Sequence, residues 1–138
     1  MIDPTEFQTV DTWENELRDA IKEAALPGLE NFAIETFSSQ VNLETDQLNR
    51  AVPHLLIGFV SGDHSNGYVR GDVLNFAAVA IVPGALADVR RQTAIRALWM
   101  VRAWMDDPAE PTVYQPIRTS VNQYNPVCVA TLELKRVG

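Results

Sequence analysis

The chain has 138 residues, a length that fits one domain with a substantial hydrophobic core. It contains no apolar run close to the ~20 residues that a membrane-spanning helix needs, and its acidic N-terminus lacks the layout of a signal peptide. The net charge of −7 argues against nucleic-acid binding through phosphate neutralisation. We therefore expect a cytoplasmic protein that binds neither membrane nor nucleic acid.

Few residues are of the kinds that carry catalysis or bind metal. The single cysteine, Cys128, excludes an internal disulfide and lies between Val127 and Val129 in an alternating apolar run. It has no His or basic neighbour in sequence to lower the pKa of its thiol, so a buried hydrophobic role is expected. The two histidines, His54 and His64, have no Cys or His at metal-ligand spacing. We expect neither a metal nor a cofactor.

The charge is unevenly distributed along the chain. Residues 1–50 contain eleven acidic and three basic residues, whereas the remainder contains seven acidic and eight basic residues. An acidic excess favours solubility. It is also compatible with the wall of a channel that DNA passes through without binding, and both interpretations stay open.

The first predicted element is an amphipathic helix. Residues 1–10 are expected to form a flexible arm, and Asp11 is a good N-cap with Glu14 at capping-box spacing. The apolar positions recur at intervals of three and four residues on one face. They are Trp13, Leu17, Ala20, Ile21 and Ala24. The sequence Leu-Pro-Gly at 26–28 ends this helix.

The next segments alternate between strand and loop. Residues 31–37 can alternate Phe32 and Ile34 against Ala33 and Glu35, which predicts a strand. Residues 38–51 are polar and irregular, with a short helical turn expected near 44–48.

Two strong β signals follow and predict a hairpin. Residues 53–60 form the first strand, 61–67 are rich in turn formers, and 68–82 form a second strand interrupted only by Gly71. At ~3.3 Å per residue the second strand would reach roughly 45 Å, beyond a typical strand. Either Gly71 marks a bulge and bend, or the hairpin projects and meets another subunit.

A long helix is predicted over residues 85–105, and it has two apolar sides. The side expected to face the core comprises Leu86, Arg90, Ala94, Ala97, Leu98, Val101, Trp104 and Met105. Ile95 and Trp99, one turn apart, form a second patch that is flanked by Arg91 and Arg102. Tryptophan with arginine is typical of interface hot spots, so we expect an interface here. Solvated arginines, or a Trp99 buried in the core, are the alternatives.

Two strands are expected to complete the chain. Pro116 makes the strand over 113–119 an edge or bulged strand, and residues 127–137 alternate well. The order of elements predicts an α/β fold of the α+β type, formed by a single domain over 1–138. We expect a mixed, mainly antiparallel sheet of four to five strands, two helices packed on one face and a long projecting β-hairpin.

The polar cluster on the predicted hairpin turn invites a hydrolase interpretation. Ser61, Asp63, His64 and Ser65 supply the residue types of a catalytic triad. A triad needs side chains that converge from a rigid scaffold beside an oxyanion hole, and four near neighbours on one turn do not provide that. We expect a solvated turn, no enzyme activity, and a candidate interface at Asp63, His64 and Asn66.

In its element order the sequence resembles the tail terminator proteins of long-tailed phages. The segments that carry the resemblance are the helix over 13–21 with its end at 26–28, the strands over 53–57, 73–82 and 129–134, and the helix over 91–99. The resemblance covers about residues 12–136 and rests on the order, length and texture of the elements.

This resemblance implies a structural virion protein with no cofactor. Such subunits form a homohexameric ring that caps the tail tube, stops its polymerisation and joins the tail to the neck proteins of the head. In contractile tails the ring also meets the sheath protein, and DNA passes through its lumen. The expected location is the virion, with assembly in the host cytoplasm. The rival hypotheses are a small cytoplasmic α/β enzyme or ligand-binding domain, a related neck or head–tail connector subunit, and a subunit of a contractile injection machine.

Overall fold

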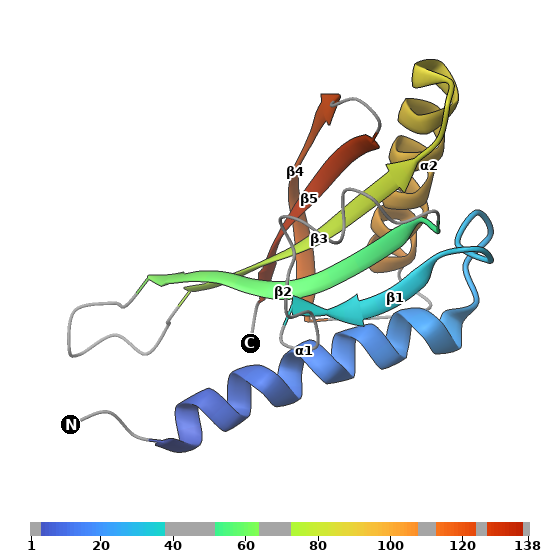
Figure 1. The fold of residues 1–138 in the computed structure, drawn as a ribbon. Helices are drawn as coiled ribbons and strands as arrows, with labels where there is room; N and C mark the ends of the chain where they lie inside the picture. The colour runs from blue at the N-terminus through green and yellow to red at the C-terminus, as the bar shows by residue number, and fades with distance from the viewer. Residues whose placement is uncertain (1–3, 38–51, 64–72, 108–112, 124–126, 137–138) are drawn as a thin grey trace.

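The computed structural model describes residues 4–37, 52–63, 73–107, 113–123 and 127–136, which form one sheet and two helices (Figure 1). The elements are α1 (Pro4–Ala24), β1 (Ala33–Thr36), β2 (His54–Asp63), β3 (Val73–Pro83), α2 (Ala87–Asp106), β4 (Tyr114–Gln123) and β5 (Val127–Arg136). The predicted order of elements is confirmed. The predicted helical turn at 44–48 lies outside the described residues.

The sheet is mixed and mainly antiparallel, as predicted. Its strand order is β1-β2-β3-β5-β4, and β1 alone runs parallel to its neighbour. The Pro116-containing strand β4 lies at an edge, and its register with β5 shifts between Pro116 and Arg118. Proline cannot donate a ladder hydrogen bond, which explains both its edge position and the irregularity beside it.

The hairpin is confirmed as a pairing of β2 with β3, whose register reaches Asp63 opposite Val73. The first strand runs three residues further than predicted, and it contains an irregularity between Phe59 and Ser61. The expected bulge at Gly71 and the extension of the second strand to residue 68 lie outside the described residues. The projecting tip therefore stays a prediction.

Helix α1 begins at Pro4, seven residues before the expected start at Asp11. The predicted flexible arm is therefore wrong for residues 4–10, and the N-cap at Asp11 is wrong as well. Proline suits the first turn of a helix, because its missing N–H would have no partner within the helix there. The residues after Pro4 contain no glycine or further proline that would interrupt the helix before the apolar stripe.

Glu14 connects α1 to the sheet instead of capping the helix. Its side chain is 4% exposed, and its Oε2 accepts a hydrogen bond of 2.8 Å from the backbone N–H of Phe59, 45 residues away. Strand β1 pairs with β2 only as far as Ile57, so Phe59 lies where that ladder has ended. The carboxylate thus satisfies a strand N–H that β1 no longer reaches.

A second contact joins α1 to the end of the last strand. The Arg136 guanidinium lies 4.0 Å from the centroid of the Trp13 ring and 5.9 Å from that of Tyr114. Tyr114 in turn packs edge-on against Phe76, with ring centroids 5.4 Å apart. Burial raises the pKa of the Tyr114 hydroxyl, and the neighbouring Arg136 opposes part of that rise.

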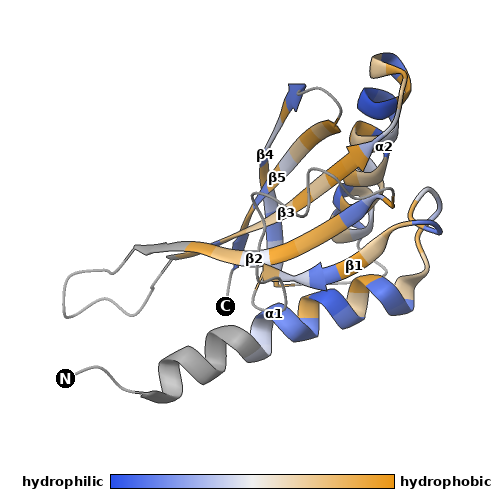
Figure 2. Cartoon of the chain, viewed as in Figure 1, coloured by the Kyte–Doolittle hydropathy of each residue, from blue (hydrophilic) through white to orange (hydrophobic). Residues whose placement is uncertain are grey.

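Both helices cover the same face of the sheet, as predicted, and share one hydrophobic core. Leu17 and Ile21 of α1 belong to it, together with Ala94, Ala97, Leu98 and Val101 of α2. The strands contribute Leu55, Ile57, Phe76, Ala78, Ala80, Cys128, Ala130, Leu132 and Leu134. Figure 2 shows that β2 and β3 are mainly hydrophobic, whereas hydrophilic and hydrophobic residues alternate along α1. Neither of the two described helices is long and apolar enough to cross a membrane.

The other face of the sheet carries a smaller cluster in which Gly58 is a required small residue. Leu56, Ile81 and Val127 are buried there against Phe37. The Phe37 ring lies over β2 so closely that a Cβ on Gly58 would overlap the carbon atoms of the ring. Only glycine therefore fits beneath this ring.

We expect Gly58→Ala to destabilise the fold by about 1–3 kcal/mol, because the added methyl group forces the Phe37 ring out of place. Thermal or denaturant melts of the purified protein measure this loss. In a Phe37→Ala background the same change should cost clearly less. Equal costs in both backgrounds would show that the Phe37 ring is not what excludes a side chain.

Glu14→Ala should lower the free energy of unfolding by about 1–3 kcal/mol, because it removes the acceptor of the buried Phe59 N–H. The matched control is Glu16→Ala, an exposed glutamate on the same helix, which should change stability by less than about 0.5 kcal/mol. Chemical denaturation of both variants measures the two losses. Equal losses would show that Glu14 stabilises the protein only as a helix residue and not through its hydrogen bond to Phe59.

Candidate functional site

The rotation of α2 about its own axis decides which of its side chains are available to a partner. Its buried residues are Arg90, Ala94, Ala97, Leu98, Val101 and Met105, all of which were predicted to face the core. Trp104 is half-buried. The expectation for Leu86 is wrong, because this residue is the N-cap with an extended backbone and its side chain is 68% exposed.

Arg90 is a buried cation at the start of α2. Its Nη1 donates a hydrogen bond of 2.6 Å to the carbonyl oxygen of Gly84, whose φ of +149° favours glycine. A side-chain hydrogen bond from the first turn of α2 therefore holds the turn that precedes this helix. This contact explains how an arginine is accommodated on the core side of α2.

Cys128 lies near this arginine and is fully buried. Burial raises the pKa of its thiol, while the positive charges of Arg90 and Arg91 oppose the rise. A buried thiol with a raised pKa is protonated at neutral pH and is therefore a poor nucleophile. The predicted role as a small buried hydrophobic residue is confirmed.

The second apolar patch of α2 faces outward. Trp99 is 59% exposed, so its alternative placement in the core is wrong, and Ile95 is half-buried beside it. Arg91 and Arg102 are exposed on the same side of the helix. The Arg102 guanidinium lies 5.9 Å from the Trp99 ring centroid and 3.7 Å from the Asp106 carboxylate. Because both charged groups are exposed, this ion pair adds little stability and leaves Arg102 available to a partner.

Strand β4 extends this surface with a residue that the sequence analysis missed. Ile117 is 57% exposed and lines a shallow hollow together with Trp99 and Arg102. It occupies the register shift after Pro116, so it is displaced from the regular alternation of the strand. The sequence signal for this exposed residue was a large aliphatic side chain directly after the strand proline, Pro116. We call the surface formed by Arg91, Ile95, Trp99, Arg102 and Ile117 the α2–β4 face.

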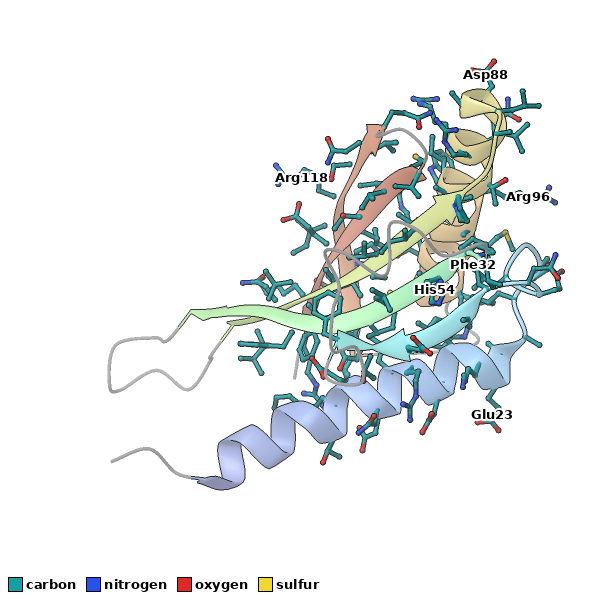
Figure 3. The ribbon with its side chains drawn as sticks, viewed as in Figure 1. Glu23, Phe32, His54, Asp88, Arg96 and Arg118 are labelled. Carbon is teal, nitrogen blue, oxygen red and sulfur yellow. The ribbon has the colours of Figure 1, made fainter. Side chains whose placement is uncertain are left out.

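Two polar contacts tie β4 to its neighbours, one to α2 and one to β5. The Gln123 side-chain amide donates a hydrogen bond of 2.9 Å to the carbonyl oxygen of Ala87 at the start of α2. Arg118 pairs with Glu133 across the strands, with 2.5 Å between Nε and Oε2. Glu133 alternates with the buried Leu132 and Leu134, so its carboxylate lies on the side of the sheet away from α2. Figure 3 shows Arg118 at the outer edge of the sheet.

The polar cluster of the hairpin is only partly described. Ser61 and Asp63 belong to β2, whereas His64, Ser65 and Asn66 lie outside the described residues. The interface expected at Asp63, His64 and Asn66 stays a prediction. His54 is buried, and its Nδ1 donates a hydrogen bond of 2.7 Å to the carbonyl oxygen of Val52, as suits a structural histidine.

Within the five described ranges, no three His, Cys, Asp or Glu side chains come together as metal ligands would. The hollow on the outer side of α2 is an open depression lined by Val89, Ile95 and Trp99 among others. Its lining combines exposed apolar side chains with the polar side chains of Gln92, Thr93 and Arg96.

A scan against models of protein families and a search of curated proteins gave no match.

The outward position of Trp99 leads to a stability test. Trp99→Ala should leave the stability of the monomer within about 0.5 kcal/mol of wild type, because the side chain is largely solvated. Its neighbour Leu98 is fully buried, so Leu98→Ala should cost about 2–5 kcal/mol. Melts at low protein concentration measure both. A loss of several kcal/mol for Trp99→Ala would mean that Trp99 supports the fold itself.

Proposed function

We propose that this protein is a structural subunit that forms a ring on the end of a phage tail tube, as a tail terminator does. The α2–β4 face carries the proposal, because it places two large exposed apolar side chains, Trp99 and Ile117, beside arginines. Tryptophan and arginine are among the residues most enriched at binding hot spots.

The elements that form this face are well anchored in the core. Helix α2 is held by fully buried Ala94, Ala97 and Leu98, and β4 is paired along its length with β5. A partner that docks there meets a preorganised surface, so little conformational entropy is lost on binding. A rigid surface of this kind suits a subunit of an assembly, because a mobile loop would lose more conformational entropy when it binds.

The resemblance to tail terminators supplies the rest of the proposal. Six copies form a ring that caps the tail tube, stops its polymerisation and contacts the neck proteins of the head. Where the tail is contractile, the ring also contacts the sheath protein. The net charge of −7 suits a ring through which DNA passes without binding. The location that follows is the virion.

The proposal predicts self-association that increases on tail tubes. Size-exclusion chromatography with light scattering should give a mass near six subunits, either for the protein alone or after addition of purified tail tubes. Trp99→Ala should reduce this association, because it removes the largest exposed side chain of the face. Val52→Ala is the matched control, since Val52 is 50% exposed and lies outside the α2–β4 face; it should associate as the wild type does.

A protein that stays monomeric at all concentrations and never binds tubes would contradict the proposal. Binding to tail-less heads but not to tubes would instead favour the related neck or head–tail connector. A hydrolytic activity that copurifies with the protein and is lost in a variant of the hairpin cluster would favour the enzyme hypothesis.

A further inference from the structure

Helix α1 presents an acidic stripe to solvent. Glu16, Asp19 and Glu23 are exposed and follow one another at spacings of three and four residues, so they share one side of the helix. That side lies opposite Leu17 and Ile21, which are buried in the core. Figure 3 shows Glu23 projecting from α1 away from the sheet. We refer to Glu16, Asp19 and Glu23 as the acidic stripe.

The acidic stripe has few internal partners among the described residues. Arg18 pairs with Asp19 at 2.9 Å, with side chains 26% and 64% exposed. An adjacent, solvated pair of this kind is worth little, so it competes weakly with an external cation. No ion pair of Glu16 or Glu23 is found in the part of the chain that the structure describes.

The α2–β4 face carries two exposed cationic side chains, one of which is paired with the exposed Asp106 carboxylate at 3.7 Å. Trp99 and Arg102 line the hollow that borders β4. Ile95 and Arg91 lie one and two turns before Trp99 on the same side of α2. The flank of α2 nearer to α1 is marked by different residues. Trp104 lines a hollow with Ala20 and Glu23, and the Arg96 side chain lies 3.8 Å from the Cβ position of Gly28 in the loop after α1.

The two charged surfaces therefore belong to different sides of one subunit. Helix α1 packs on β1 and β2, whereas α2 packs on β3, β4 and β5 (Figure 1). Among the described residues, no member of the acidic stripe forms an ion pair with Arg91 or Arg102 of its own chain. Opposite charge on separate sides of a subunit is what a head-to-tail contact between identical copies requires.

We propose that the acidic stripe of one copy docks on the α2–β4 face of the next. This inference rests on the proposed ring and specifies the contact from which it is built. Arg91 and Arg102 lie about 16 Å apart along α2, and Glu16 and Glu23 about 10 Å apart along α1. Two helices in contact at roughly 8–10 Å between their axes can bring both pairs of charges together. Trp99 and Ile95, between the arginines, then lose their contact with water.

The contact is heterologous, because each copy offers two different surfaces. It can therefore close into a ring when the rotation per subunit divides a full turn, and it forms an open filament otherwise. Because the charges lie at exposed positions, the association should weaken as the salt concentration rises.

Charge reversal in two halves of the contact provides the test. The first variant carries Arg91→Glu and Arg102→Glu, and the second carries Glu16→Lys and Glu23→Lys. Each reversal places like charges across the contact, so each variant alone should lose the assembled peak in size-exclusion chromatography with purified tail tubes. A chain that carries all four substitutions, and a 1:1 mixture of the two variants, should both regain it.

The matched control is Lys135→Glu, which reverses a charge on the face of β5 away from the helices. Circular dichroism melts of every variant show whether the monomer is still folded. A reversal that unfolds the monomer is replaced by the neutral pair Arg91→Gln with Arg102→Gln or Glu16→Gln with Glu23→Gln. The neutral variants should weaken the association without the recovery in the mixture.

The outcomes separate this contact from the proposed function. If the wild type and both reversal variants assemble equally well, the proposed contact is wrong and the proposed ring is unaffected. A wild type that never assembles overturns both. Loss of assembly in the arginine reversal, with full assembly of the Glu16→Lys, Glu23→Lys variant alone, would mean that α2 meets α2, which also overturns the contact. Binding of wild type to duplex DNA that Arg91→Glu with Arg102→Glu abolishes would assign the face to nucleic acid instead.

Discussion

The close approach of α2 to the sheet is the constraint on which the rest of the surface depends. Ala94 and Ala97 of the helix share one hydrophobic core with Ala78, Ala80 and Ala130 on the facing strands. All five side chains are fully buried. Small residues on both sides bring the helix near the strands, and a close-packed interior leaves no room for a larger group. The alanines of α2 therefore face the sheet, and the same rotation of the helix directs Trp99 to solvent.

Several other features follow from this placement of α2. The adjoining edge strand β4 borders the exposed side of the helix, and its irregular residue Ile117 completes the apolar surface. The side of α2 that carries Trp104 faces α1 instead. Three sides of α2 thus have three roles. One side packs in the core, one faces α1 and one forms part of the α2–β4 face.

Helix α1 is positioned by different contacts, of which the Glu14–Phe59 hydrogen bond is the most specific. This bond and the Arg136–Trp13 contact turn the apolar side of α1 to the sheet. The remaining side carries Glu16, Asp19 and Glu23 outward. The acidic side chains Glu16, Asp19 and Glu23 thus lie on the helix that packs on β1 and β2, whereas Arg91 and Arg102 lie on the helix that packs on β3, β4 and β5.

The periodicity of the sequence by itself determined the elements, the core side of α2 and the outward patch at Ile95 and Trp99, because local spacing decides which residues share a face. The edge position of β4 followed from Pro116 for a similarly local reason. The tertiary structure alone decided the role of Glu14, whose spacing matched a cap but whose partner is 45 residues away. It also decided that Ile117 joins Trp99, because α2 and β4 are brought together only by their packing on the same strands.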